Sequence, residues 1–166
     1  MSARASLHGA PDPARFVRAD APVGFEIEGV KKRAVIQLMG SRLWGRFNPN
    51  HWDPVYARET GLPAPIQTGE MSSAYIAEMC VNAFGPAVFR NARFVCKYVA
   101  STRANELIET GGRVREKVPK GSGFRFTVDV WAKNEAGELK TVGFVEVDVG
   151  VDDPGVDGPA IAEERT

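Results

Sequence analysis

The chain has 166 residues, of which 43% are apolar. This length supports one hydrophobic core and is short for two ordinary domains, so we expect a single domain. Lysine plus arginine and aspartate plus glutamate both number 21, which gives a formal net charge of zero. That balance argues against nucleic acid or an anionic membrane surface as a partner.

The two cysteines, Cys80 and Cys96, lie in apolar segments and do not form a metal-type CxxC pair. We expect both cysteines to be core residues. Their use is also typical of a protein in a reducing intracellular compartment. The N-terminal MSARASLHGAPDPAR lacks the apolar core of a signal peptide, and no run approaches the roughly 20 apolar residues of a membrane span. The sequence therefore predicts a soluble, cytoplasmic protein. It shows no metal-ligand cluster and no phosphate-binding glycine loop, so we expect no metal and no bound cofactor.

Composition divides the chain into three parts. Residues 1–22 are rich in Ala, Pro, Arg and Asp without periodicity, and VDDPGVDGPAIAEERT at the end has the same character. We expect residues 1–22 to form a flexible arm and residues 151–166 a flexible tail. Apolar residues are spread evenly in between, which predicts one domain over residues 23–150.

The first predicted elements surround a polar turn. FEIEGV, near residue 25, is a candidate strand, and GRFNPNHWDP follows at residues 45–54. Asp53 and Pro54 fit the N-cap and first position of a short helix over VYARET, which Gly61 closes. The proline-spaced GLPAPI then forms an extended link to Gly69. This order places His51 just before one helix and Gly69 at the start of another.

A long helix is predicted from Glu70 to Phe84, where Gly85 and Pro86 stop it. It is apolar nearly all round, so neighbouring elements must cover it on most sides. Within it, Glu78 should be paired or should face a gap.

The remaining elements are strands. GFRFTVDVWAK and LKTVGFVEVDVG alternate apolar and polar residues around the turn NEAGE, which predicts an antiparallel hairpin. ARFVCKYVA and ELIETGGRVREKV are candidate partner strands, giving a four-strand meander after the helix. The predicted fold is therefore α+β, with an antiparallel sheet of about five strands wrapped around one long central helix. This is the hotdog arrangement, which usually completes its cover by dimerising.

Four short motifs carry a family resemblance: NPNH, DPVYARETGL, API and TG, in this order over residues 45–71. They resemble the MaoC-like dehydratases and (R)-specific enoyl-CoA hydratases, whose motif runs D-x-N-P-(I/L/V)-H and then Gly-x-x-x-P-(I/L)-x-x-Gly. The resemblance covers most of residues 23–149. It implies a hydro-lyase that acts on a CoA thioester in a hotdog dimer or larger assembly.

The resemblance also implies residue roles. In that family, an aspartate and a histidine hold the water that adds to a trans-2-enoyl thioester, and a glycine N–H binds the thioester oxygen. His51 matches the catalytic histidine, and Asn48 with Pro49 matches the Asn-Pro that shapes the turn. Gly69 matches the oxyanion glycine. We add Asn48, and Thr68 with its neighbour Gln67, as candidate contacts to substrate.

The sequence departs from this motif at Arg46, which occupies the aspartate position, and at Asn50, which replaces an apolar residue. Arginine stays charged and cannot accept a proton, and it would lower the pKa of a nearby histidine. Arg46 is either a surface residue or a pocket residue that grips a carboxylate, phosphate or thioester oxygen. VASTRANE also replaces the family's usual residues after the helix, in a loop that often borders the substrate pocket.

Several interpretations therefore stay open. The chain is an acyl-thioester hydratase with an altered site, or a non-catalytic subunit that binds acyl-CoA beside a catalytic hotdog partner. A thioesterase that uses Glu70 is a third alternative, although Glu70 also suits the first turn of a helix. His51 has a purely structural alternative, as a loop histidine that bonds a backbone carbonyl. Asp53 is expected to act as an N-cap.

Overall fold

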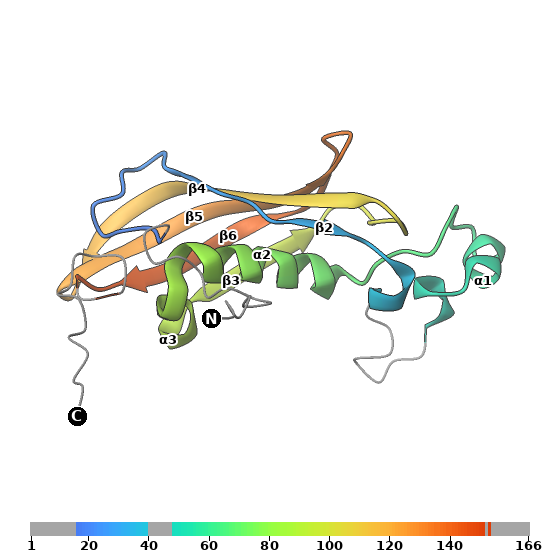
Figure 1. Ribbon diagram of the computed structural model, residues 1–166, viewed down its shortest axis with the longest axis horizontal. Helices are drawn as coiled ribbons and strands as arrows, with labels where there is room; N and C mark the ends of the chain where they lie inside the picture. Colours follow the sequence, from blue (N-terminus) through green and yellow to red (C-terminus); the bar gives the residue numbers. More distant parts are fainter. Residues whose placement is uncertain (1–15, 40–47, 152, 154–166) are drawn as a thin grey trace, which may run out of the picture.

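A computed structural model describes residues 16–39, 48–151 and 153 (Figure 1). The strands are β1 Glu26–Ile27, β2 Lys31–Arg33, β3 Arg93–Tyr98, β4 Leu107–Lys120, β5 Gly123–Asn134 and β6 Leu139–Val149. The helices are α1 Pro54–Glu59, α2 Gly69–Phe84 and α3 Val88–Asn91, with short 3₁₀ turns at Ile36–Leu38, Pro49–His51 and Gly85–Ala87. None of the described helices is long and apolar enough to cross a membrane.

The strands form one antiparallel sheet that curls around α2 (Figure 1). Its order is β1-β4-β5-β6-β3, and β2 also pairs with β4. Inward-facing residues of the long strands, among them Phe126, Val128 and Val145, are fully buried in a cluster with Ile76 and Met79 of α2. The predicted hotdog architecture is confirmed, with six strands in place of about five.

The predicted four-strand meander is wrong in one connection. Strands β4, β5 and β6 follow one another through hairpins as expected, but β3 pairs with β6 at the sheet edge. The chain therefore crosses from β3 to the far side of the hairpins before β4 begins. The loop that makes this crossing, residues 99–106, passes the N-terminal end of α2 and becomes part of the site described below.

The central helix is covered as its sequence requires. It begins at Gly69, one residue before the predicted start, and Gly85 ends it with a positive φ of 54°. An exposed stripe remains on its surface at Glu70, Ala74, Glu78 and Asn82. Glu78 is paired, because its carboxylate lies 2.7 Å from Nζ of Lys32 on β2.

Part of the segment assigned to the N-terminal arm packs on this helix. Phe16, Val17, Ala19 and Ala21 are buried, and the Val17 N–H donates to the carbonyl of Ala83. The ring of Phe16 lies against Gly85, where an added Cβ would come within 2.7 Å of it. The packed part of the chain therefore includes residues on the N-terminal side of residue 23.

Candidate active site

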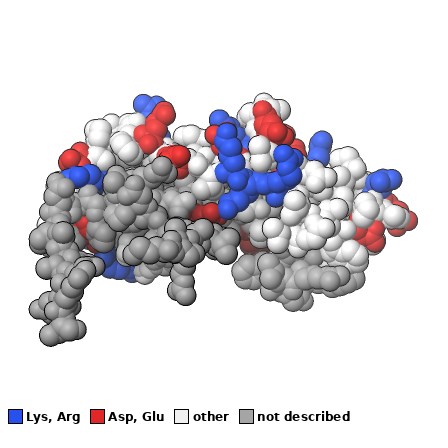
Figure 2. All heavy atoms as spheres, viewed as in Figure 1, with Lys and Arg blue, Asp and Glu red and all other residues white. Residues whose placement is uncertain are grey.

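A cavity of about 850 Å³ opens at the N-terminal end of α2. Three segments line it: the polar turn with Asn48 and His51, residues 66–70 with Ser72, and residues 98–102 with Thr141 of β6. The cavity thus joins the predicted motif to the crossing loop between β3 and β4. Basic and acidic side chains are interspersed on the face of the molecule shown in Figure 2.

The polar turn positions His51 at this cavity. The Asn48 side chain accepts from the Asn50 N–H at 3.1 Å, and Pro49 opens the 3₁₀ turn that ends at His51. His51 Nδ1 lies 2.7 Å from the carbonyl oxygen of Ile66. Since a carbonyl only accepts, Nδ1 is the donor in this bond, and Nε2 is therefore the ring nitrogen that can accept a proton. His51 can therefore have both of the roles considered above. Nδ1 holds the loop by bonding the Ile66 carbonyl, and Nε2 is available to act as a base.

Asn50, the departure from the family pattern, has a structural role here. Its side-chain oxygen accepts from the Thr60 hydroxyl at 2.6 Å, and its backbone carbonyl accepts from the Ile66 N–H at 3.0 Å. It ties the turn to the end of α1 and to the link before α2. Asp53 caps α1 as expected, since its carboxylate accepts from the Val55 and Tyr56 N–H groups.

Gly69 begins α2 at the cavity wall. A Cβ at this position would lie 2.6 Å from the Tyr98 ring, so only glycine permits this contact. Among the described residues, no hydrogen-bond acceptor is recorded for the N–H groups of Gly69 and Glu70. These N–H groups lie at the positive end of a 16-residue helix, an arrangement that stabilises developing negative charge on an oxygen. Glu70 itself is exposed at the cavity mouth.

The inner wall of the cavity is polar. Gln67, Ser72, Thr102 and Thr141 line it, and all four are buried. Nε2 of Gln67 donates to the Tyr75 hydroxyl at 2.7 Å, whereas Gln67 Oε1 and the neighbouring Thr68 hydroxyl are buried without a partner within the described residues. Thr68 precedes the helix without capping it through its side chain.

An ion cluster holds the crossing loop against the cavity. Lys140, only 2% exposed, donates to the Ser101 carbonyl at 2.9 Å and lies 2.7 Å from Glu138 and 3.4 Å from Glu106. Burial would raise the pKa of Glu106, but bonds from the Arg103 N–H, Asn134 and Lys140 together lower it below its ordinary value. The loop that carries Ser101 and Thr102 is thus fixed by buried charge.

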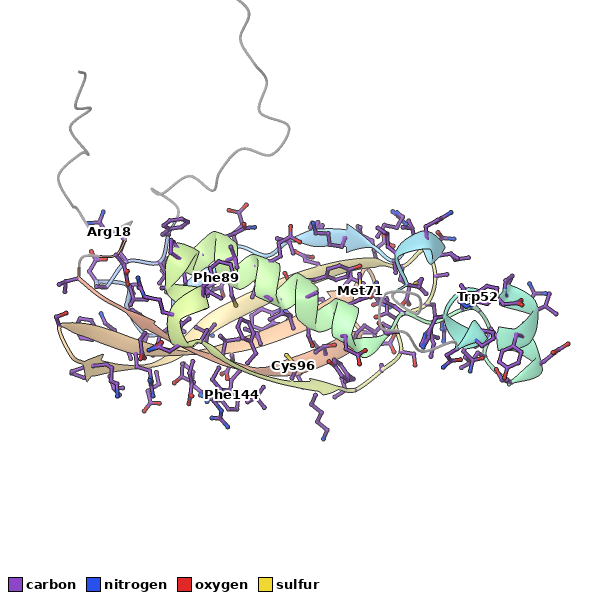
Figure 3. The ribbon with its side chains drawn as sticks, turned by 90° about the horizontal axis from the view of Figure 1, so that it is seen from below. Arg18, Trp52, Met71, Phe89, Cys96 and Phe144 are labelled. Carbon is purple, nitrogen blue, oxygen red and sulfur yellow. The ribbon has the colours of Figure 1, made fainter. Side chains whose placement is uncertain are left out.

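The structure brings together His51, Asn48, Thr68 and Gly69 from the predicted set, while Arg46 lies outside the described residues. Sequence reasoning missed Tyr98 and Thr141, because only the pairing of β3 and β6 in the sheet brings them to the cavity. It also missed Ser72, which lies three residues after Gly69 on α2. Cys80 is a core residue, as expected, and burial raises the pKa of its thiol to about 12. Cys96 is half-buried on β3, beside α2 (Figure 3).

No family model matches the sequence, and no curated protein matches it. The structure, however, resembles solved structures. The (R)-hydratase PhaJ1 from Pseudomonas aeruginosa aligns with a TM-score of 0.69 and 21% identity, over 80% of this chain and 84% of that chain. A MaoC-like dehydratase from Rhodospirillum rubrum aligns with a TM-score of 0.64 and 18% identity, over 79% of this chain and 94% of that chain.

A third similar structure is the ChsH1-ChsH2 complex from Mycobacterium tuberculosis, with a TM-score of 0.65 and 17% identity over 77% of this chain and 98% of the matched chain. At these identities the likeness establishes the fold. The chain therefore has the hotdog fold found in MaoC-like dehydratases and (R)-hydratases.

Proposed function

We propose that the protein hydrates a trans-2-enoyl thioester, or dehydrates the corresponding 3-hydroxyacyl thioester. The observation that carries this proposal is the presence, in one cavity, of His51 and the N-terminal end of α2 at Gly69, where neither His51 Nε2 nor the Gly69 N–H has a hydrogen-bond partner among the described residues. The likeness to the (R)-hydratase and the MaoC-like dehydratase supports it.

In the proposed reaction, the thioester oxygen accepts from the N–H at Gly69, which draws electron density from the double bond. His51 Nε2 takes a proton from water as the hydroxyl oxygen adds to the β-carbon. The resulting enolate is stabilised at the helix end, and the imidazolium returns its proton to the α-carbon. One water is consumed, and no group on the protein is changed.

The test is an assay of the purified protein with trans-2-butenoyl-CoA, followed by the loss of enoyl absorbance, with free thiol measured in parallel. We expect hydration, and we expect His51→Gln to reduce kcat by about 100-fold or more, the usual contribution of a positioned base. His8→Gln is the matched control, since His8 and His51 are the only histidines. Hydration that is unaffected by His51→Gln would contradict the assigned role.

The variant Arg46→Asp provides a second test in the same hydration assay. If Arg46 occupies the position of the missing carboxylate, Arg46→Asp restores a second proton acceptor beside His51 and raises the hydration rate. If Arg46→Asp does not raise the hydration rate and His51→Ala keeps full activity, the residue roles of the family motif do not apply to this chain.

The second candidate function is a non-catalytic subunit that binds acyl-CoA. The arginine at the aspartate position favours it, as does the likeness to a chain of a two-component complex. Binding of acyl-CoA by calorimetry, without hydration or hydrolysis, is the result expected for this function. Thiol release that is lost in Glu70→Gln would instead identify a thioesterase.

A further inference from the structure

The inner end of the cavity has a composition unsuited to a plain hydrocarbon chain. The four buried side chains on this wall are only 5%, 3%, 4% and 1% exposed, at Gln67, Ser72, Thr102 and Thr141 respectively. The structure shows no side-chain hydrogen bond within the described residues for the hydroxyls of Ser72, Thr102 and Thr141. Apolar side chains also line the cavity, at Ile66, Val99 and Ala100. The cavity lining therefore combines buried hydrogen-bonding groups with apolar ones.

Gln67 is the most informative of these residues. Its amide is fixed at one end, because Nε2 donates to the Tyr75 hydroxyl at 2.7 Å. The other end, Oε1, is buried and has no partner among the described residues. A buried amide oxygen without a donor is costly, and native proteins retain few of them. The unpaired oxygen therefore indicates a ligand that supplies the donor.

Thr68 provides a second observation at the same place. Its hydroxyl is also buried and unpaired within the described residues, although threonine at a helix N-cap usually bonds the first turn. The two unpaired groups are adjacent in sequence, and both residues line the cavity next to Gly69. A ligand bound at Gly69 would therefore lie beside both residues.

We propose that the substrate's acyl group carries a hydroxyl beyond the reacting carbons, and that this hydroxyl donates to Gln67 Oε1 and accepts from the Thr68 hydroxyl. This inference rests on the proposed function and specifies its substrate class. A site built to hydrogen-bond a hydroxyl discriminates against the analogue that lacks it, because the buried polar groups would then stay unpaired. Gln67 is thus a specificity-determining residue.

The experiment compares the affinities of two thioesters that differ only in this hydroxyl, trans-2-pentenoyl-CoA and 4-hydroxy-trans-2-pentenoyl-CoA. Calorimetry on the His51→Gln variant reports binding without turnover. We expect the hydroxylated thioester to bind at least 10-fold more tightly. Gln67→Met, which keeps the side-chain length and removes the acceptor, should reduce this preference below about 3-fold, whereas Gln67→Glu should retain it because an acceptor oxygen remains.

Gln37→Met is the matched control, since Gln37 is the only other glutamine and lies exposed outside the cavity. It should leave the preference unchanged. Equal affinity for the two thioesters, or a preference that survives Gln67→Met, would overturn the inference and leave the proposed function standing. Failure of both thioesters to bind the folded protein would overturn the proposed function and this inference with it.

Discussion

Gly69 and Tyr98 lie in close contact at the candidate site. The tyrosine ring, which belongs to β3, lies where a side chain at residue 69 would have to be. Gly69→Ala would gain helix propensity, worth up to about 1 kcal/mol, but the clash should outweigh it and cost about 1–3 kcal/mol of stability. We also expect acyl-thioester binding to weaken, since the ring and the helix start must separate. Chemical denaturation and calorimetry measure the two effects.

The double variant Gly69→Ala/Tyr98→Ala separates packing from function. Without the ring, the clash is absent, and stability should return to that of Tyr98→Ala alone. Binding should stay weak if substrate itself must approach the Gly69 N–H. Full recovery of binding in the double variant would show that glycine serves only the contact with Tyr98.

Residues whose roles depend on neighbours in sequence were predictable. Asp53 has its N-cap role because Pro54 and a short helix follow it, and His51 sits in a turn set by Asn48. Tyr98 and the Gln67–Tyr75 bond had no such local signal, since each joins segments that only the fold brings together. Arg46, which stands at the aspartate position of the motif in the sequence, lies outside the described residues.

At the scale of elements, the crossing loop depends on Lys140. Its ammonium is buried, bonds the Ser101 carbonyl and neutralises Glu106 and Glu138. Removing one member of a buried ion pair leaves uncompensated charge and usually costs about 3–5 kcal/mol. We expect Lys140→Met to cost less, about 1–3 kcal/mol, because the carboxylates of Glu106 and Glu138 are partly exposed. Lys31→Met is the matched control, at an exposed pair 3.9 Å long. It should change stability by less than about 0.5 kcal/mol.

The same cluster should make stability depend on pH. The pKa of Glu106 is lowered in the folded state, so its ionised form stabilises the fold above the unfolded pKa. That contribution is lost as the pH falls from the ordinary glutamate pKa, about 4.3, through the lower pKa of the folded state. Glu106→Gln should therefore lower stability at pH 7 and flatten the acid limb of a plot of unfolding free energy against pH. An unchanged acid limb would show that Glu106 contributes nothing to it.

Element prediction succeeded where periodicity was long. The α2 helix and the β5–β6 hairpin were found nearly to the residue because an apolar face repeats over many residues. The short β2, Lys31–Arg33, was missed because three basic residues at an edge have no apolar alternation. The place of β3 beside β6 was also missed, since strand pairing between distant segments leaves no mark in local sequence.

At the scale of the whole molecule, three phenylalanines on the outside of the fold differ in how far other side chains shield them from solvent. Phe144 lies on the face of the sheet away from α2, where the guanidinium groups of Arg93 and Arg115 stack on it at 5.5 and 5.4 Å (Figure 3). Phe89 of α3 is 76% exposed, the highest value among the large apolar side chains of the described residues. Phe94, at the start of the edge strand β3, is 36% exposed. These two phenylalanines mark the region where we expect another hotdog subunit to bind.

We expect the protein to self-associate through this region. The wild-type protein should sediment as a dimer or larger species at micromolar concentration, and Phe89→Glu should shift it toward monomer, because burying an unpaired carboxylate opposes association. Val55→Glu is the control: Val55 is 62% exposed on α1, at the opposite end of the molecule from α3 in Figure 1, and should leave the assembly intact. A wild-type monomer that becomes a stoichiometric complex only with a second hotdog chain would instead identify a heteromeric hydratase. In that case, Phe89→Glu should weaken the mixed complex.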